Sequence, residues 1–211
     1  MQRISVAIID YGFGNVRSVV NALAAVNLSP QVVSEPDEIS DFANVILPGV
    51  GAFATAMKVI EDKGLDDAIR ASANAGANVL GICLGMQLLF GSSSEFGSHP
   101  GLGILEGTVV PLVDPAEVFP GLKSTHISWE RVQPNDSGRL SSWFSDTSDE
   151  YYFVHSFVAQ PLSQRVIAGT SNYRGIEFVA AVEHENVAGV QFHPERSGKG
   201  GLSLLSHFFR E

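Results

Sequence analysis

The single cysteine of this 211-residue chain is the side chain best suited to covalent chemistry. Cys83 stands between Gly81 and Gly85, after an apolar, β-prone run at 79–82 and before strong helix formers at 84–90. A nucleophile on such a sharp strand-to-helix turn needs small neighbours, and the positive end of the following helix favours the thiolate. Because a lone cysteine is also often a small buried hydrophobic residue, Cys83 alone does not establish a nucleophile.

A histidine and a glutamate two residues apart follow the last apolar run of the sequence. The run at 187–192 predicts a buried strand, and His193 stands at its carboxyl end, where open α/β sheets present catalytic groups. Pro194 favours an extended conformation for His193, which would place Glu195 on the same side. A carboxylate that orients an imidazole beside Cys83 would complete a nucleophile–base–orienter set. Taken alone, His-x-Glu is also a common exposed pair.

A glycine-rich loop follows the predicted strand at 44–47. Gly49, Val50 and Gly51 come after Pro48 and lead into a predicted helix. A loop at the carboxyl end of a parallel strand lies on the functional edge of the sheet, and its N–H groups suit a phosphate or a transient oxyanion. The Gly-Lys-Ser/Thr ending of a nucleotide P-loop is absent, and a plain tight turn remains the alternative.

A second glycine pair, Gly12 and Gly14, follows the first apolar run at 4–10. Glycines after a strand are typical of dinucleotide-binding turns, but Arg17 occupies the third glycine position of that fingerprint. No acidic residue ends a clear second strand. The pattern therefore favours a structural turn near a partner surface.

The order of the predicted elements indicates an α/β fold in one domain, residues 1–211. Strands and helices alternate in the first part, which predicts a mostly parallel open sheet flanked by helices; short strands and turns beyond residue 107 predict an antiparallel β extension. The predicted strands are 4–10, 31–34, 44–47, 79–82, 109–113, 127–132, 152–158, 166–170 and a hairpin of 178–182 with 188–192. The predicted helices are 16–24, 53–60, 65–75, 84–90 and 202–209, and 91–101 is predicted as a polar loop.

Composition excludes several classes of protein. A formal net charge of −10 without a basic cluster argues against nucleic acid or anionic membrane as partner. No apolar run approaches the roughly 18 residues of a membrane span, and the N-terminus lacks the features of a signal peptide. One cysteine excludes an internal disulfide and predicts the reducing cytoplasm. No metal site is predicted, because metal-ligand spacing is absent among Cys83 and the other histidines: His99, His126, His155, His184 and His207.

Three motifs together resemble the class I, or triad, glutamine amidotransferases. They are Gly-Ile-Cys-Leu-Gly-Met-Gln at 81–87, Pro-Gly-Val-Gly at 48–51 and His-Pro-Glu at 193–195. More narrowly, the whole chain resembles the glutaminase subunits of imidazole glycerol phosphate synthase. That resemblance rests on the stretches 9–15, 47–53, 151–156 and 191–198.

The resemblance implies hydrolysis of glutamine to glutamate and ammonia without a cofactor. Cys83 would attack the side-chain carboxamide, His193 would manage the protons and Glu195 would orient His193. The oxyanion would lie between the Leu84 N–H and one N–H of the 49–51 loop, most naturally that of Val50. The positions matching those that hold the two ends of the substrate are Gln87, Glu95 and the backbone at Ser156 and Phe157.

The same resemblance implies a heterodimer with a (β/α)₈-barrel cyclase subunit. That subunit would use the ammonia on a ribulosyl aminoimidazole nucleotide, making imidazole glycerol phosphate for histidine biosynthesis and an aminoimidazole carboxamide ribonucleotide for purine salvage. In the family the oxyanion loop needs the partner to adopt its active geometry. We therefore expect low glutaminase activity of the chain alone.

Two stretches depart from the family pattern. The family usually has Pro-His-Met/Ile-Gly-Trp-Asn where this chain has Thr-His-Ile-Ser-Trp-Glu at 125–130, and a lysine where this chain has Arg196. Both are expected near the partner or the pocket mouth. Two alternatives stay open: the same chemistry supplying another synthase, for example for amidino-sugar formation, and a non-catalytic relative that only binds a partner.

Overall fold

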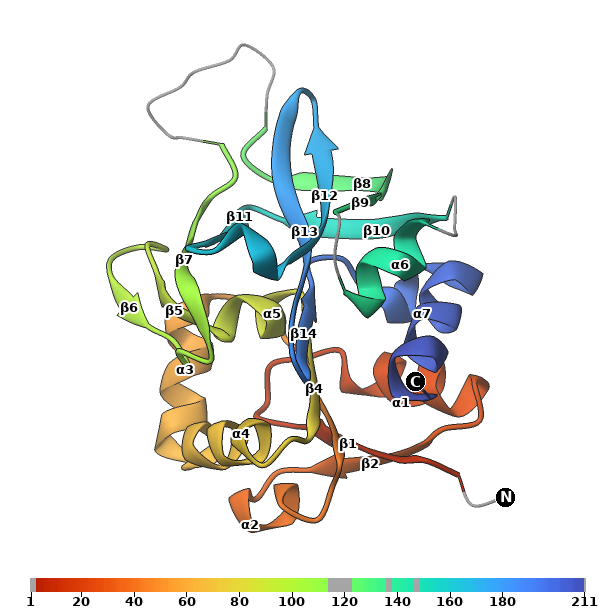
Figure 1. Cartoon of the computed structure of the whole chain (residues 1–211). Coiled ribbons are helices and arrows are strands. Elements are labelled where there is room, and N and C mark those ends of the chain that lie inside the picture. The colour runs from red at the N-terminus through yellow and green to blue at the C-terminus, as the bar shows by residue number, and fades with distance from the viewer. Residues whose placement is uncertain (1–2, 114–122, 136–137, 146–148, 211) are drawn as a thin grey trace.

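The fold is built on a central eight-stranded sheet with helices on both faces (Figure 1). It is known from a computed structural model that describes residues 3–113, 123–135, 138–145 and 149–210. The strand order is β2-β1-β3-β4-β14-β13-β12-β9. The first five of these strands are parallel, and the last three continue the sheet in antiparallel pairs. This arrangement confirms the predicted fold class.

The sheet is formed by strands from both halves of the chain. From the first half come β1 (Ser5–Ile9), β2 (Ser29–Val33), β3 (Asn44–Leu47) and β4 (Asn78–Ile82). From the second half come β9 (Gln133–Pro134), β12 (Ile167–Tyr173), β13 (Ile176–His184) and β14 (Val187–Val190). The predicted hairpin is β13 with β14, and β14 inserts beside β4.

Alternating side chains divide the apolar core into two layers. Val6 and Ile8 of β1 face one layer, whereas Ala7 and Ile9 face the other, as the twofold period of a strand requires. The first layer contains α1 (Val16–Ala25) and α7 (Gly198–Arg210), and the second contains α3 (Phe53–Asp62) and α4 (Leu65–Asn74). Figure 1 shows these two pairs of helices on opposite sides of the sheet.

The remaining strands form two smaller sheets, and the remaining helical pieces are short. A four-stranded sheet has the order β11-β7-β5-β6, and β8 pairs with β10 in a separate two-stranded ribbon. The bounds are β5 (Phe90–Ser93), β6 (His99–Pro100), β7 (Leu105–Pro111), β8 (His126–Arg131), β10 (Glu150–His155) and β11 (Phe157–Pro161). The helical pieces are α2 (Pro36–Ile39), α5 (Leu84–Leu88), α6 (Arg139–Ser145), η1 (Gln164–Val166) and η2 (Pro194–Arg196).

The predicted helix at 84–90 and the polar loop after it were partly wrong. Helix α5 ends at Leu88 because the N–H groups of Leu102 and Leu105 bond the Leu88 and Leu89 carbonyl oxygens, at 2.9 Å each. The stretch 91–101 then carries most of β5 and all of β6 instead of a plain loop. A tertiary contact, rather than local propensity, ends this helix.

The predicted strand at 152–158 is two strands in the structure. β10 pairs with β8, whereas β11 pairs with β7 in the other sheet, so the chain must turn between them. The turn falls at Ser156, whose carbonyl oxygen accepts a 2.8 Å hydrogen bond from the Leu112 N–H. This change of sheet exposes the backbone of 156–157 at the rim of the pocket described below.

Candidate active site

Cys83 occupies the tight turn from β4 into α5. Its backbone dihedrals are φ 54° and ψ −110°, a region that costs a non-glycine residue conformational energy. A Cβ on Gly81 would lie 2.7 Å from the Met86 Cα, and one on Gly85 would overlap the Leu47 carbonyl oxygen. Both flanking glycines are therefore required for the strand, the turn and the helix to approach this closely.

We expect Gly85→Ala to lower the free energy of unfolding by about 3 kcal/mol, because a methyl group pressed into fixed backbone forces the elements apart. Urea denaturation followed by circular dichroism would measure the loss. Gly91→Ala is the matched control, since the nearest atom to its added Cβ, the Gly107 carbonyl oxygen, is 3.3 Å away. Equal stability of the two variants would contradict this account of the turn.

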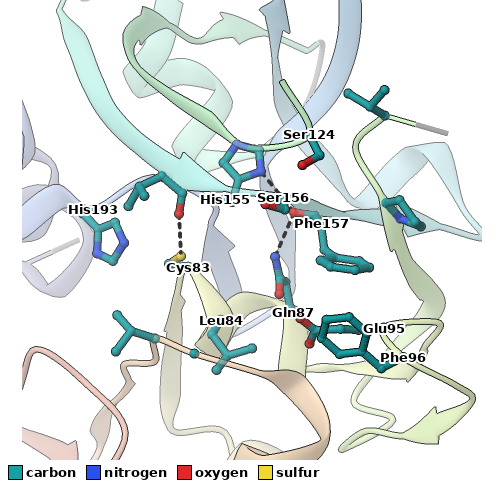
Figure 2. Close-up of a pocket in the computed structure, with 15 residues that line it drawn as sticks. Cys83, Leu84, Gln87, Glu95, Phe96, Ser124, His155, Ser156, Phe157 and His193 are labelled. Atoms are coloured by element: carbon teal, nitrogen blue, oxygen red, sulfur yellow. Dashed lines mark hydrogen bonds between the residues drawn. The ribbon is translucent and has the colours of Figure 1, made fainter. Parts of the chain in front are cut away.

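The sulfur of Cys83 is almost enclosed, with the residue 6% exposed. The side-chain N–H of Gln191 points at the sulfur from 3.7 Å, and the Val154 carbonyl oxygen lies 3.9 Å away. In Figure 2 the sulfur lies between His193 on one side and Gln87 on the other. The Cys83 N–H donates to the Val190 carbonyl oxygen at 2.8 Å, which fixes the turn to the adjacent strand.

His193 reaches the site because β14 runs parallel to β4, with Val190 opposite Ile82. The His193 N–H donates to the Tyr152 carbonyl oxygen at 2.9 Å, and its Nδ1 lies 2.9 Å from Glu195 Oε1. His193 itself is extended, as expected before a proline, but residues 194–196 form a 3₁₀ turn. The expectation of an extended chain through Glu195 was therefore wrong: the turn, rather than strand alternation, brings the carboxylate back to the imidazole.

The surroundings of His193 favour its imidazolium form. Burial by itself lowers the pKa of His193, but the neighbouring Cys83 and then the hydrogen-bonded Glu195 outweigh it and raise the pKa from 6.5 to about 10. The Glu195 side chain is only 1% exposed, and its Oε2 has no hydrogen-bond partner among the described residues. A buried carboxylate with this one partner depends on the imidazolium for its charge compensation.

The loop at 48–51 lies directly against the turn that carries Cys83. The Tyr11 hydroxyl donates to the Pro48 carbonyl oxygen at 2.9 Å. A Cβ on Gly49 would lie 2.6 Å from that hydroxyl and 2.9 Å from the Gly85 nitrogen, so only glycine fits there. Gly51 has φ 103°, a conformation that also favours glycine, and Val50 between them is exposed.

A pocket of about 650 Å³ opens beside the sulfur. Its lining brings together most of the residues selected from the sequence: Val50, Gly51, Cys83, Leu84, Gln87, Glu95, Ser156, Phe157 and His193 (Figure 2). Gly49 and Glu195 are not in the lining. Gly49 packs against Tyr11 and the first residues of α5, and Glu195 contacts His193 from behind. The Glu95 carboxylate accepts a 2.6 Å hydrogen bond from the Phe53 N–H at the start of α3.

Two polar residues at the site had no role in the sequence analysis. Gln191 is fully buried and links the sulfur to Gln87, whose Nε2 donates to Gln191 Oε1 at 3.0 Å and to the Phe157 carbonyl oxygen at 3.0 Å. His155 lines the pocket from the end of β10. Both residues lie inside motifs on which the family resemblance rests, but the spacing of residues in the sequence does not predict which groups they contact.

The described residues contain no cluster of three or more His, Cys, Asp or Glu side chains suited to a metal ion. None of the helices in this part of the chain is both long and apolar enough to cross a bilayer.

Comparison with known proteins places this site in a family. Residues 7–211 match the profile of "Glutamine amidotransferase class-I". The chain is 45% identical over 203 residues to the imidazole glycerol phosphate synthase subunit HisH of Moorella thermoacetica, covering 96% of this chain and 93% of that one. It is 42% identical to the HisH of Wolinella succinogenes, covering 96% and 98%. A structure of PurLQS from Thermotoga maritima superposes with a TM-score of 0.75 at 20% identity, covering 98% of both chains, which shows the shared fold.

The fold, the turn at Cys83 and the family match define a class-I glutamine amidotransferase. Within that class, the identity of 40–45% over nearly the whole chain shows that it belongs to the HisH family, the glutamine amidotransferase subunits of imidazole glycerol phosphate synthase.

Proposed function

We propose that this chain, as one domain over residues 1–211, hydrolyses glutamine through a Cys83–His193–Glu195 triad and passes the ammonia to a (β/α)₈-barrel cyclase subunit. The observation that carries the proposal is the shared pocket: Cys83 and His193 both line it, and His193 is held from behind by a buried carboxylate. The product would enter histidine biosynthesis, as the family membership indicates. The free cysteine supports a cytoplasmic location.

The first half of the reaction forms a thioester and releases ammonia. The Cys83 thiolate attacks the side-chain amide carbon of glutamine, and the carbonyl oxygen becomes an oxyanion. The first N–H groups of a helix have no acceptor within the helix, so the Leu84 N–H can stabilise the oxyanion together with an N–H of the 49–51 loop. As the tetrahedral intermediate collapses, the C–N bond breaks and the His193 imidazolium gives its proton to the leaving nitrogen, so the amide departs as ammonia.

The second half consumes water. His193, now neutral, takes a proton from a water molecule that attacks the thioester carbon, and the C–S bond breaks to regenerate the thiolate and the imidazolium. The net reaction converts glutamine and water into glutamate and ammonia and needs no cofactor. Glu195 stabilises the imidazolium that forms in this step.

We infer substrate-holding roles for the polar groups around the rest of the pocket. The pocket volume exceeds what a free amino acid needs, and Gln87, Glu95 and the backbone at 156–157 surround it opposite His193. Glu95 suits the α-ammonium group of glutamine, and backbone N–H groups at Ser156 and Phe157 suit its carboxylate. Gln87 supports this wall through its bond to the Phe157 carbonyl oxygen.

The proposed partner would dock beside His193. Trp129 is 49% exposed on β8, and its ring packs 5.8 Å from that of Tyr152. The Arg196 guanidinium packs on the same tyrosine, with its carbon 5.2 Å from the centre of the Tyr152 ring. Aromatic and arginine side chains are typical of protein interfaces. The centres of the Tyr152 and His193 rings are 6.5 Å apart, so the cluster adjoins the proposed triad. This cluster supports docking of another subunit directly over the triad.

Glutaminase activity should be low for the chain alone and rise by about 10²-fold or more when the barrel cyclase and its nucleotide are added, because completing an oxyanion site is worth that much. Glutamate production would be measured with and without the partner. A chain from the same class that supplies a different synthase serves as control and should not respond to this cyclase. Full activity in isolation would contradict the coupling, and stimulation by a different synthase would favour the alternative acceptor.

A further inference from the structure

Two buried histidines beside the pocket have no part in the reaction described above. His126 on β8 and His155 on β10 are cross-strand partners, with His126 Nδ1 3.0 Å from His155 Nε2. The other ring nitrogen of His155 lies 3.0 Å from the Phe157 carbonyl oxygen. Both residues are buried, with exposures of 0% and 7%, so both rings depend mainly on these contacts for their hydrogen bonds.

The contacts of His126 continue outward along β8 to the surface. Its Nε2 lies 2.7 Å from Ser128 Oγ, and Ser128 Oγ donates to Glu130 Oε1 at 2.8 Å. Residues 126, 128 and 130 share one face of the strand, because side chains alternate along it. The Glu130 side chain is 38% exposed, so the series ends at a carboxylate in contact with solvent.

The contacts of His155 continue inward to the nucleophile. The Phe157 carbonyl oxygen that faces His155 also accepts from Gln87 Nε2, and Gln87 Nε2 donates to Gln191 Oε1. Gln191 Nε2 in turn points at Cys83 Sγ. A continuous series of polar contacts therefore joins an exposed carboxylate to the sulfur, passing through the wall that would hold glutamine.

The hydrogen positions on both rings follow from this series. A carbonyl oxygen can only accept, so the His155 Nδ1 must carry a hydrogen. Burial and then the neighbouring His126 lower the pKa of His155 to about 3, so the ring is neutral and its Nε2 is an acceptor. His126 Nδ1 must then carry a hydrogen as well, which leaves His126 Nε2 facing the Ser128 hydroxyl.

The Ser128 hydroxyl has one proton and faces two groups. Burial lowers the pKa of His126, so its Nε2 is an acceptor, and the one Ser128 proton can serve only that nitrogen or the Glu130 carboxylate at a time. A glutamine at position 130 would satisfy both contacts, because its amide N–H can donate to Ser128 while Ser128 donates to His126. A leucine could do neither, although its size is similar.

Three side chains, two in β8 and one just before it, mark the departures from the family motif noted above. Ser128 and Glu130 stand where that motif has glycine and asparagine, and a glycine would offer no hydroxyl to His126. Thr125 stands in place of the proline, and its Oγ1 lies 2.8 Å from Ser156 Oγ. All three differences add polar contacts that lead to the 156–157 segment of the pocket.

We propose that Ser128 and Glu130 are positioning residues of the glutamine pocket: their contacts hold the His126–His155 pair in place and thereby hold the Phe157 carbonyl group and Gln87. The expected change in KM rests on the proposed glutaminase function. The expected contacts of the two histidines do not depend on that function. Losing the series frees the 156–157 backbone to turn away from the substrate. The effect should fall on substrate binding rather than on the chemistry at Cys83.

The kinetic test uses two pairs of variants in the complete synthase. Ser128→Ala and Glu130→Leu should each raise KM for glutamine about three- to tenfold with kcat within about twofold, the effect of losing one hydrogen bond from the binding wall. Ser128→Thr keeps the hydroxyl and Glu130→Gln keeps a hydrogen-bonding side chain, so both variants should have a KM close to that of the wild type. An unchanged KM in Ser128→Ala and Glu130→Leu, or an equal loss in both members of a pair, would overturn the proposal.

A second measurement separates this proposal from the function it rests on. ¹⁵N NMR of the labelled chain reports which ring nitrogen carries the hydrogen, whether or not the protein hydrolyses glutamine. The wild type should show both His126 and His155 protonated at Nδ1, and Ser128→Ala should shift the His155 Nδ1 resonance, which reports a weaker bond to the Phe157 carbonyl oxygen, while Ser128→Thr keeps it. A wild-type His155 protonated at Nε2 would overturn the series even if the glutaminase activity is present.

Discussion

Cys83→Ala should reduce glutamine hydrolysis by about 10⁴- to 10⁶-fold, the range seen when a nucleophile is removed from a catalytic set. The loss is this large because no other described nucleophile lies at the turn where the Leu84 N–H and His193 meet the pocket. The measurement is glutamate release by the complete synthase with glutamine at saturation. Hydrolysis within about 10²-fold of the wild-type rate would refute the assignment of the nucleophile.

The same variant should leave the use of supplied ammonia intact, because that reaction would occur on the other subunit. Cyclase turnover with an ammonium salt at alkaline pH therefore serves as the internal control. The folded state should also persist, since alanine removes only the sulfur and keeps the Cβ that the turn accommodates. A variant that loses both activities would point to misfolding rather than to lost chemistry, and its urea denaturation curve would distinguish the two.

Glu195→Gln should lower kcat by about 10²- to 10⁴-fold, because the imidazolium loses the negative charge that stabilises it. Glutamine keeps the size of the side chain, so the 1% exposed site remains filled. Its amide oxygen could still accept from His193 Nδ1, but its amide nitrogen would be left in the place where Glu195 Oε2 has no partner. Steady-state kinetics with glutamine would give the loss.

The pKa of His193 should fall in the same variant. In the wild type the raised pKa, about 10, keeps the imidazolium from acidic pH up to that value and loses it as the pH rises through it. Relative to an ordinary histidine at 6.5, the charged His193 stabilises the fold fully below pH 6.5 and loses that contribution between 6.5 and about 10. Titrating the ¹³C-labelled imidazole by NMR would compare the two proteins. An unchanged midpoint in Glu195→Gln would mean that Glu195 does not support the charge.

The parallel half of the fold was predictable because its signals are local. The apolar runs of β1, β3 and β4 are continuous, as strands buried on both faces require, and the helices between them show one apolar stripe. The apolar run of β4 places Cys83 at the carboxyl end of a strand, and the run of β14 does the same for His193. Only the register of β14 beside β4, which no local pattern contains, makes them neighbours.

The sequence analysis failed where long-range contacts override local preference. The end of α5 depends on Leu102 and Leu105, and the break at Ser156 depends on a change of sheet. The 3₁₀ turn at Glu195 was missed because an extended strand and a tight turn place residues two apart almost equally well. The network through His126 required knowledge of the β8–β10 pairing, since its members come from separate strands.

The position of β14 has a consequence for how the protein is made. This strand is encoded more than a hundred residues after β4, yet it lies between β4 and β13 in the middle of the sheet. A nascent chain leaving the ribosome therefore exposes its thiol long before the imidazole exists, and the central gap closes only near the end of synthesis. Pairings of such high contact order form late in folding, so Cys83 and His193 come together only once the last strand has been inserted.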